Sequence, residues 1–180
     1  MARSKPAAKD AIALLKADHR EVEDMFEQFE KARDDDRKQE LATNICNALK
    51  VHTAIEQEIF YPAFLEASDD IDIHHEAEIE HRAATNLIEE IEASSPDDDY
   101  FAPMVMVLSE MIKHHVKEEE KTGGMFSVAR ESKMDLVTLG EQLAARKAEL
   151  ESGDMGDADM PPPGSGEKRG KTERMMKETR

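Results

Sequence analysis

Six side chains of the kinds that bind transition metals recur along the chain at matching helical positions. Two glutamates each follow a histidine by four residues, and residues four apart lie on one face of an α-helix. These pairs are His52 with Glu56 and His115 with Glu119. Imidazole nitrogens and carboxylate oxygens together suit first-row transition metals. The full set is His19, His52, Glu56, His81, His115 and Glu119.

These polar residues occupy positions that the hydrophobic pattern assigns to a buried face. His19, for example, falls between Leu15 and Val22 in a stripe with steps of four and three residues. A lone core histidine is usually a hydrogen-bonded structural residue, and a lone His-x-x-x-Glu is often a surface pair. Here four helices each carry one inward histidine, twice with a glutamate. Buried carboxylates need compensating charge, so the pattern predicts bound metal.

The donor types narrow the choice of metal. A set without thiolate disfavours structural zinc of the cysteine kind, and a set with imidazole disfavours all-oxygen calcium or magnesium sites. Mixed nitrogen and oxygen donors, with two glutamates able to bridge, suit two iron ions; manganese or a mixed pair stays open. With one oxo or hydroxo bridge, about ten of twelve coordination positions are filled. About two are left for O₂, peroxide or NO.

Other histidines and one tyrosine lie near this pattern. His75 and His114 point roughly 100° away from the inward stripe, so we expect them to be exposed or to support the ligands from outside. His74 lies on the stripe about 10 Å along the helix axis from His81, so we expect it near the bundle end. Tyr61 is a hydrogen-bond donor to the site, an open-site ligand or an amphipathic residue at the bundle end.

Almost all of residues 10–150 show helical periodicity, so helices must position these side chains. Polar runs at 33–36 and 68–70 separate the first three helices, and the third stops before Ser94. The second contains Pro62, where we expect a kink. The fourth starts near Asp98 and is broken at Gly123–Gly124.

Four long helices with short polar connections predict an all-α, antiparallel up-down-up-down four-helix bundle. An additional C-terminal helix is expected over 125–151, where Leu136, Leu139 and Leu143 form an apolar stripe that packs on the bundle or across one end. We therefore expect a flexible N-terminus at 1–9 and one domain at 10–151. A tail at 152–180, rich in Gly and Pro and poor in large apolar residues, is expected to be disordered.

Composition limits the classes of partner. The chain has 180 residues, 41 Asp and Glu against 24 Lys and Arg, and a net charge of −17. That charge repels nucleic-acid phosphates and anionic membrane surfaces. No apolar run approaches the roughly 20 residues of a membrane span, and we find no secretory signal. A single cysteine, Cys46, fits a reducing cytoplasm.

Four stretches, residues 16–20, 52–62, 80–82 and 114–120, resemble the hemerythrin-like HHE cation-binding family. The resemblance covers residues 10–150. It implies an antiparallel four-helix bundle that holds a non-haem di-iron centre. By position it implies terminal ligands at His19, His52, His81 and His115, with bridges at Glu56 and Glu119.

The chain departs from this family at two places. Oxygen-carrying hemerythrins have a further histidine one turn before the third-helix ligand, where this chain has Ala77. One ligand fewer implies a more open and more reactive iron pair than a simple O₂ store needs. Glu118, Glu119 and Glu120 are consecutive, and we prefer Glu119 because it has the same offset from its histidine as Glu56.

The sequence supports three hypotheses about function. The first is a non-haem di-iron protein that binds or reacts with O₂, peroxide or NO, in redox sensing or stress handling; as an enzyme it would be a peroxide- or NO-directed oxidoreductase. The second is iron storage or buffering, although no second cluster of inward carboxylates is visible. The third is a helical interaction protein whose metal is a structural staple. The oligomeric state and the electron donor stay open.

Overall fold

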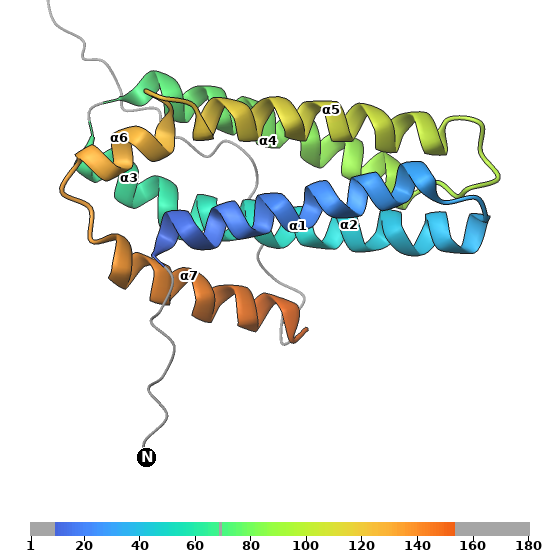
Figure 1. Cartoon of the computed structure of the whole chain (residues 1–180), viewed down its shortest axis with the longest axis horizontal. Helices are drawn as coiled ribbons and strands as arrows, with labels where there is room; N and C mark the ends of the chain where they lie inside the picture. The colour runs from blue at the N-terminus through green and yellow to red at the C-terminus, as the bar shows by residue number, and fades with distance from the viewer. Residues whose placement is uncertain (1–9, 69, 154–180) are drawn as a thin grey trace, which may run out of the picture.

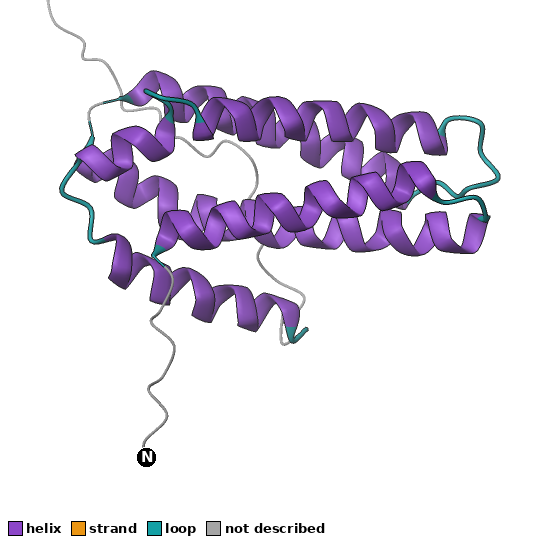
Figure 2. Cartoon of the chain, in the orientation of Figure 1, coloured by secondary structure: helices purple, strands orange, loops and turns teal. Residues whose placement is uncertain are grey.

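A computed structural model describes residues 10–68 and 70–153, and every regular element within these ranges is helical (Figure 2). The predicted flexible N-terminus at 1–9 and residues 154–180 of the predicted tail lie outside the described residues. The helices are α1 (Ala11–Lys31), α2 (Asp35–Ile55), the π-helical turn η1 (Glu56–Phe60), α3 (Tyr61–Ala67), α4 (Ile71–Glu92), α5 (Phe101–Glu120), α6 (Met125–Glu131) and α7 (Leu136–Glu151).

The predicted all-α, up-down-up-down bundle is confirmed (Figure 1). α1 and α2 run antiparallel as one pair, and α4 and α5 run antiparallel as the other. α3 continues the line of α2 at the end of the bundle where α6 also lies. α7 lies outside the four long helices, where it packs on α1, α2 and η1. In the described residues no helix is both long enough and apolar enough to cross a lipid bilayer.

Aspartate side chains fix where four of the helices begin, α1, α2, α4 and α7. The Oδ1 atom of Asp10 accepts a hydrogen bond from the backbone N–H of Ala13 at 2.7 Å, which starts α1. Asp34 accepts in the same way from Arg37 at 2.8 Å at the start of α2. Such a cap satisfies one of the N–H groups that a helix start leaves unpaired. The rotation of α1 and α2, and therefore of their histidines, is set from the first turn.

The expected kink near Pro62 takes the form of a π-helical turn directly before it. The backbone N–H of Tyr61 donates to the carbonyl of Glu56, five residues earlier, and Pro62 itself has no N–H to donate. A turn widened by one residue brings residues five apart toward one face. Glu56 and Tyr61 are accordingly both buried in the interior, 0% and 1% exposed.

The single helix predicted over 125–151 is wrong, because the structure divides it into α6 and α7. The hydroxyl of Ser132 donates to the carbonyl of Ala129 and ends α6. Asp135 then caps α7 by accepting from both the backbone N–H and the hydroxyl of Thr138. Local side-chain hydrogen bonds of this kind compete with a continuous helix. The break allows α7 to turn back along the bundle and bury Leu143.

A polar layer separates two apolar clusters of the core. One cluster contains Val22 and Leu49 and fills the end of the bundle away from α3. The other contains Leu15 and Ile55 and includes the buried faces of α3, α6 and α7. His19 lies between Leu15 and Val22 in the sequence, and the second-helix histidine lies between Leu49 and Ile55. The inward histidines are thus at one level along the bundle axis.

The exit from α5 depends on a close backbone approach at Gly124. The backbone here folds back so that a Cβ at this position would collide with the carbonyl oxygen of Glu118 and lie 2.9 Å from that of Glu119. Gly123 before it has a φ of 77°, in the left-handed region that favours glycine. The turn therefore ends α5 immediately after Glu119 and Glu120.

We predict that Gly124→Ala lowers the free energy of unfolding by about 2–3 kcal/mol, because the methyl group overpacks against fixed carbonyls. Gly153→Ala is the matched control: its φ is 72° but a Cβ there meets nothing within 4 Å, so it should lose only about 1 kcal/mol. Urea unfolding of the two variants measures the difference. Equal losses would show that close approach at Gly124 contributes nothing.

Candidate metal centre

All six predicted ligand residues converge in the polar layer of the bundle. His19 comes from α1, His52 from α2 and Glu56 from η1. The remaining three come from α4 and α5. None of the six is more than 7% exposed: His19, His52, Glu56, His81, His115 and Glu119. Five elements therefore deliver nitrogen and oxygen donors to one buried volume.

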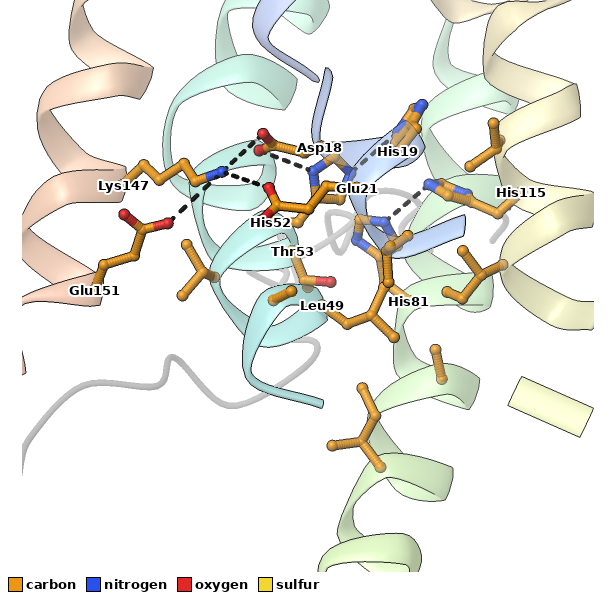
Figure 3. Close-up of a pocket in the computed structure, with 17 residues that line it drawn as sticks. Asp18, His19, Glu21, Leu49, His52, Thr53, His81, His115, Lys147 and Glu151 are labelled. Atoms are coloured by element: carbon orange, nitrogen blue, oxygen red, sulfur yellow. Dashed lines mark hydrogen bonds and ion pairs between the residues drawn. The ribbon is translucent and has the colours of Figure 1, made fainter. Parts of the chain in front are cut away.

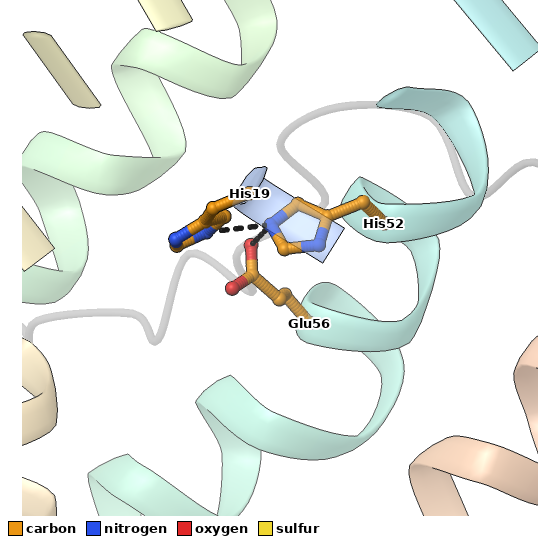
Figure 4. Close-up of side chains that lie close together, drawn as sticks. All are labelled: His19, His52 and Glu56. Carbon is orange, nitrogen blue, oxygen red and sulfur yellow. Dashed lines mark hydrogen bonds and ion pairs between the residues drawn. The ribbon is translucent and has the colours of Figure 1, made fainter. Parts of the chain in front are cut away.

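The histidines meet as two pairs through their Nε2 atoms. The Nε2 atoms of His19 and His52 lie 3.2 Å apart (Figure 4), and those of His81 and His115 also lie 3.2 Å apart. Two imidazole lone pairs at this distance repel each other unless a proton or a cation lies between them. Each pair presents two nitrogens to one point.

Each glutamate reaches both histidine pairs. The Oε2 atom of Glu56 lies 3.3 Å from Nε2 of His52 and 3.3 Å from Nε2 of His81. The Oε2 atom of Glu119 lies 3.5 Å from Nε2 of His19 and 3.6 Å from Nε2 of His115. Each carboxylate thus links the two histidine pairs. Glu56 connects the histidines of α2 and α4, and Glu119 connects those of α5 and α1.

Several buried polar atoms of the cluster have no hydrogen-bond partner among the described residues. They include Oε1 of Glu56 and Oε2 of Glu119. An unsatisfied buried acceptor costs about 1–3 kcal/mol, and more when it is charged. Bound cations would remove this cost, so these residues fit a metal site by their chemistry as well as by their position.

Tyr61 also belongs to the cluster. Its hydroxyl lies 3.2 Å from Nε2 of His81, 3.3 Å from Glu56 and 3.4 Å from Glu119. Burial, followed by the charges of the two glutamates, raises the pKa of Tyr61 well above its usual value. The phenol therefore stays protonated in the metal-free protein and donates to a carboxylate. Of the three roles considered for Tyr61, a place at the bundle end away from the site is wrong.

The structure separates the three consecutive glutamates of α5. Glu119 points into the cluster, as its offset predicts. Glu118 forms an ion pair with Lys121 at the surface. Glu120 lies behind the cluster, where its Oε1 atom is 2.9 Å from Nδ1 of His19. The geometry therefore supports Glu119 as the inward donor.

The other histidines lie outside the two pairs. His75 and His114 are exposed, as expected. His74 is buried, but its ring packs edge-to-face on Tyr61 with centroids 5.4 Å apart rather than joining the cluster.

Three carboxylates that the sequence analysis did not assign support the outer sides of the histidine rings. Each is adjacent in sequence to an inward residue of its own helix, yet each faces a histidine of another helix. The sequence carries one signal for these carboxylates, their position next to an inward residue. Successive residues lie about 100° apart around a helix, so such a side chain lies at the side of the inward face. They are Glu120, 2.9 Å from Nδ1 of His19, Glu80, 2.8 Å from Nδ1 of His115, and Asp18, 3.6 Å from Nδ1 of His52.

Cavities lie on both sides of the cluster. One of about 60 Å³ is bounded by the four histidines and by apolar residues such as Leu49 and Ile112, with Lys147 at its edge (Figure 3). The other, of about 110 Å³, is bounded by Ala77, Glu119 and the Gly123 turn. The small side chain of Ala77 therefore borders space next to an inward carboxylate.

Comparisons with known proteins agree with this geometry. Residues 10–123 match the family described as hemerythrin HHE cation binding domain. A DNA nickase from Nostoc sp. is 29% identical over 112 residues, which is 61% of this chain but only 31% of that protein. A hemerythrin HHE cation binding domain-containing protein from Mycobacterium kansasii shares the fold, with a TM-score of 0.69 and 23% identity over 81% of this chain and 89% of that one.

The charges of the metal-free cluster divide unequally between its members. Burial and the neighbouring His52 lower the pKa of His19 to about 4. Burial alone would raise the pKa of Glu56, but the surrounding imidazoles, chiefly His52, outweigh it and hold that pKa well below its usual range. Burial and the charge of Glu56 raise the pKa of Glu119 well above its usual value. The metal-free site therefore holds the proton of Glu119 to a higher pH than a free glutamate does.

We predict that Glu119→Gln stabilises the metal-free protein increasingly as pH rises. The folded wild type keeps a proton that the unfolded chain releases above about pH 4.5, so the raised pKa costs stability at higher pH. The advantage of the variant should grow by about 1.4 kcal/mol for each pH unit above that value, until the folded pKa is reached. Urea unfolding at several pH values measures it. Glu118→Gln, one residue away at the surface, should show no such gain; a constant difference for Glu119→Gln would contradict the assignment.

Proposed function

Because the chain belongs to the hemerythrin HHE cation-binding family, we propose that it is a non-haem di-iron protein that reacts with O₂, peroxide or NO at the buried cluster. The family membership supports cation binding. We propose further that the cations are two irons and that they react with one of these small molecules.

The observation that carries the proposal is the sharing of both glutamates by both histidine pairs. His19, His52 and Glu56 bring their donor atoms within 4.8 Å of one another, and so do Glu56, His81 and His115. Glu56 is common to the two groups. One ion at each histidine pair would give the inward imidazole nitrogens and carboxylate oxygens a partner. A single ion at either pair would leave the other imidazoles facing each other unpaired.

The residues have separate roles in this proposal. The four imidazoles would bind the ions, and Glu56 and Glu119, which each reach both histidine pairs, would neutralise their charge. Bound iron would supply the one- and two-electron chemistry that amino-acid side chains lack. Tyr61 offers a protonated hydroxyl at the side of His81, and Ala77 borders a cavity that reaches His115 and Glu119. A proton donor in contact with the cluster favours reaction over simple reversible carriage of O₂.

Two rival functions find less support. Iron storage needs many carboxylates, whereas Glu56 and Glu119 are the only buried ones in the described part of the chain. A purely structural metal does not need the cavities that border the cluster on two sides.

We do not extend the DNA activity of the Nostoc protein to this chain. The net charge of −17 opposes binding to phosphate backbones. The chain also spans about a third of that protein. A cytoplasmic location stays part of the proposal, on the evidence of the single cysteine.

Metal analysis and spectroscopy of the iron-loaded chain test the proposal. We expect about two irons per chain, and oxygen evolution when peroxide is added, since two peroxide molecules yield one O₂ and two waters. His52→Ala should lower the iron content, whereas His114→Ala, which removes an exposed histidine, should not. Iron far above two per chain would indicate storage, and a stable, reversible O₂ band would indicate a carrier. Unchanged iron content in His52→Ala would refute the ligand assignment.

We predict that Tyr61→Phe keeps the iron content of the wild type but slows peroxide consumption about a hundredfold, because a positioned proton donor typically contributes about 10²–10⁴-fold. The visible spectrum separates the two remaining roles of Tyr61. A hydroxyl that only donates gives no phenolate-to-iron band, so the spectra of variant and wild type should coincide in that region. Loss of such a band in the variant would make Tyr61 a ligand instead.

A further inference from the structure

Two consecutive basic residues of α7 contact acidic residues of η1 and α1 beside the cluster. α7 lies beyond residues 10–123, where the family match ends. Arg146 donates from Nε and Nη2 to both oxygens of Glu58 at 2.7 and 3.2 Å. Lys147 donates from Nζ to Oδ1 of Asp18 at 2.8 Å (Figure 3). The helix outside the family domain is therefore tied to η1 and to α1 beside the cluster.

Asp18 connects Lys147 to the cluster. Its second oxygen, Oδ2, faces Nδ1 of His52 at 3.6 Å, slightly beyond hydrogen-bond distance. Both atoms are buried, and neither has a hydrogen-bond partner among the described residues. Two unsatisfied polar atoms that face each other at this distance need a shift of less than about 1 Å to pair. A hydrogen bond between them also needs a proton on Nδ1 of His52.

Metal binding would put that proton in place. The Nε2 atom of His52 faces His19 and Glu56 inside the cluster. A histidine that binds metal through Nε2 is neutral and carries its proton on Nδ1, and an acceptor there fixes both tautomer and ring orientation. Asp18 is the carboxylate in position to accept from Nδ1. The ion pair with Lys147 at 2.8 Å holds the other oxygen of Asp18.

We propose that Lys147 is a positioning residue for the metal centre: by orienting Asp18 it selects the Nδ1–H tautomer of His52 and slows loss of metal from the His19–His52 pair. Arg146 fastens α7 to the π-helical turn that carries Glu56, through its ion pair with Glu58. This inference rests on the proposed metal-binding function.

A purely structural role for Lys147 is the competing explanation. Its Nζ atom also lies 3.9 Å from Glu21 of α1 and 3.6 Å from Glu151 of its own helix, so through Glu21 it could simply fasten α7 to α1. Glu21→Gln provides the matched control, because it removes an α1 acid from Lys147 by the same acid-to-amide change as Asp18→Asn. Only Asp18 reaches His52.

The test compares Asp18→Asn, Lys147→Gln, Lys147→Arg and Glu21→Gln in the full chain. The first measurement is the tautomer ratio of His52 in metal-free protein, from ¹⁵N NMR of labelled histidine. It is made at an alkaline pH where the His52 shifts no longer change, because burial lowers the pKa of His52 but Glu56 and Asp18 outweigh burial and raise it. The second is the rate at which a chelator removes iron from loaded protein. We expect Asp18→Asn to shift the ratio toward Nε2–H and to speed iron loss by about tenfold to a hundredfold. Lys147→Gln should act in the same direction with a smaller factor.

The controls decide between positioning and fastening. Lys147→Arg should restore most of the wild-type tautomer ratio, and Glu21→Gln should leave both measurements unchanged. The double variant of Asp18→Asn and Lys147→Gln should lose no more than Asp18→Asn alone, since Lys147 acts through Asp18. If Asp18→Asn does not fold, Lys147→Gln with its Lys147→Arg rescue decides the question alone.

Two results would overturn the inference: an unchanged His52 tautomer ratio in Asp18→Asn and Lys147→Gln, or equally fast iron loss in Glu21→Gln. Failure of the proposed function looks different. A wild-type chain that takes up no iron would refute the di-iron proposal, while the tautomer measurement, made without metal, would still show whether Lys147 and Asp18 orient His52.

Discussion

The structure depends on one electrostatic constraint, the burial of two glutamates and four histidines in a single layer between two apolar clusters. Neither carboxylate is compensated by a lysine or arginine inside the layer. The imidazoles hold Glu56 ionised, and the charge of Glu56 in turn keeps Glu119 protonated in the absence of metal. Membership of a cation-binding family accounts for this arrangement, because bound cations would replace the proton on Glu119 and satisfy the remaining lone pairs.

The surroundings of the layer act on the side of each imidazole that faces away from it. Glu120 and Glu80 contact the Nδ1 atoms of two histidines, and Asp18 approaches a third. Basic residues then contact two of these acids: Lys16 and Arg20 pair with Glu120, and Lys147 pairs with Asp18. At Glu120 and Asp18, charge therefore alternates outward from the cluster to the surface, and these ion pairs help to keep the rings oriented. Through Lys147, α7 takes part in these ion pairs although it lies outside the four-helix bundle.

Much of the fold follows from the sequence because its signals are local. The apolar stripes with one inward histidine each predict the four long helices and the layer at which the histidines meet. Two local features were predicted less well. The helix expected over 125–151 is divided at residues 132–135, where the hydrogen bonds of Ser132 and Asp135 outweigh the apolar period that continues through them. The kink expected at Pro62 is a π-helical turn, whose effect on Tyr61 depends on packing that Pro62 alone does not reveal.

The sequence by itself determined which side chains face inward, since a period of 3.6 residues fixes the direction of each histidine and glutamate on its own helix. Only the tertiary structure decided how they combine: His19 with His52, His81 with His115, and each glutamate between the two pairs. It also decided that Asp18, Glu80 and Glu120 support rings on other helices. These relations depend on the distance and rotation between helices, which arise from packing of whole faces and leave no trace in the spacing of residues along one chain.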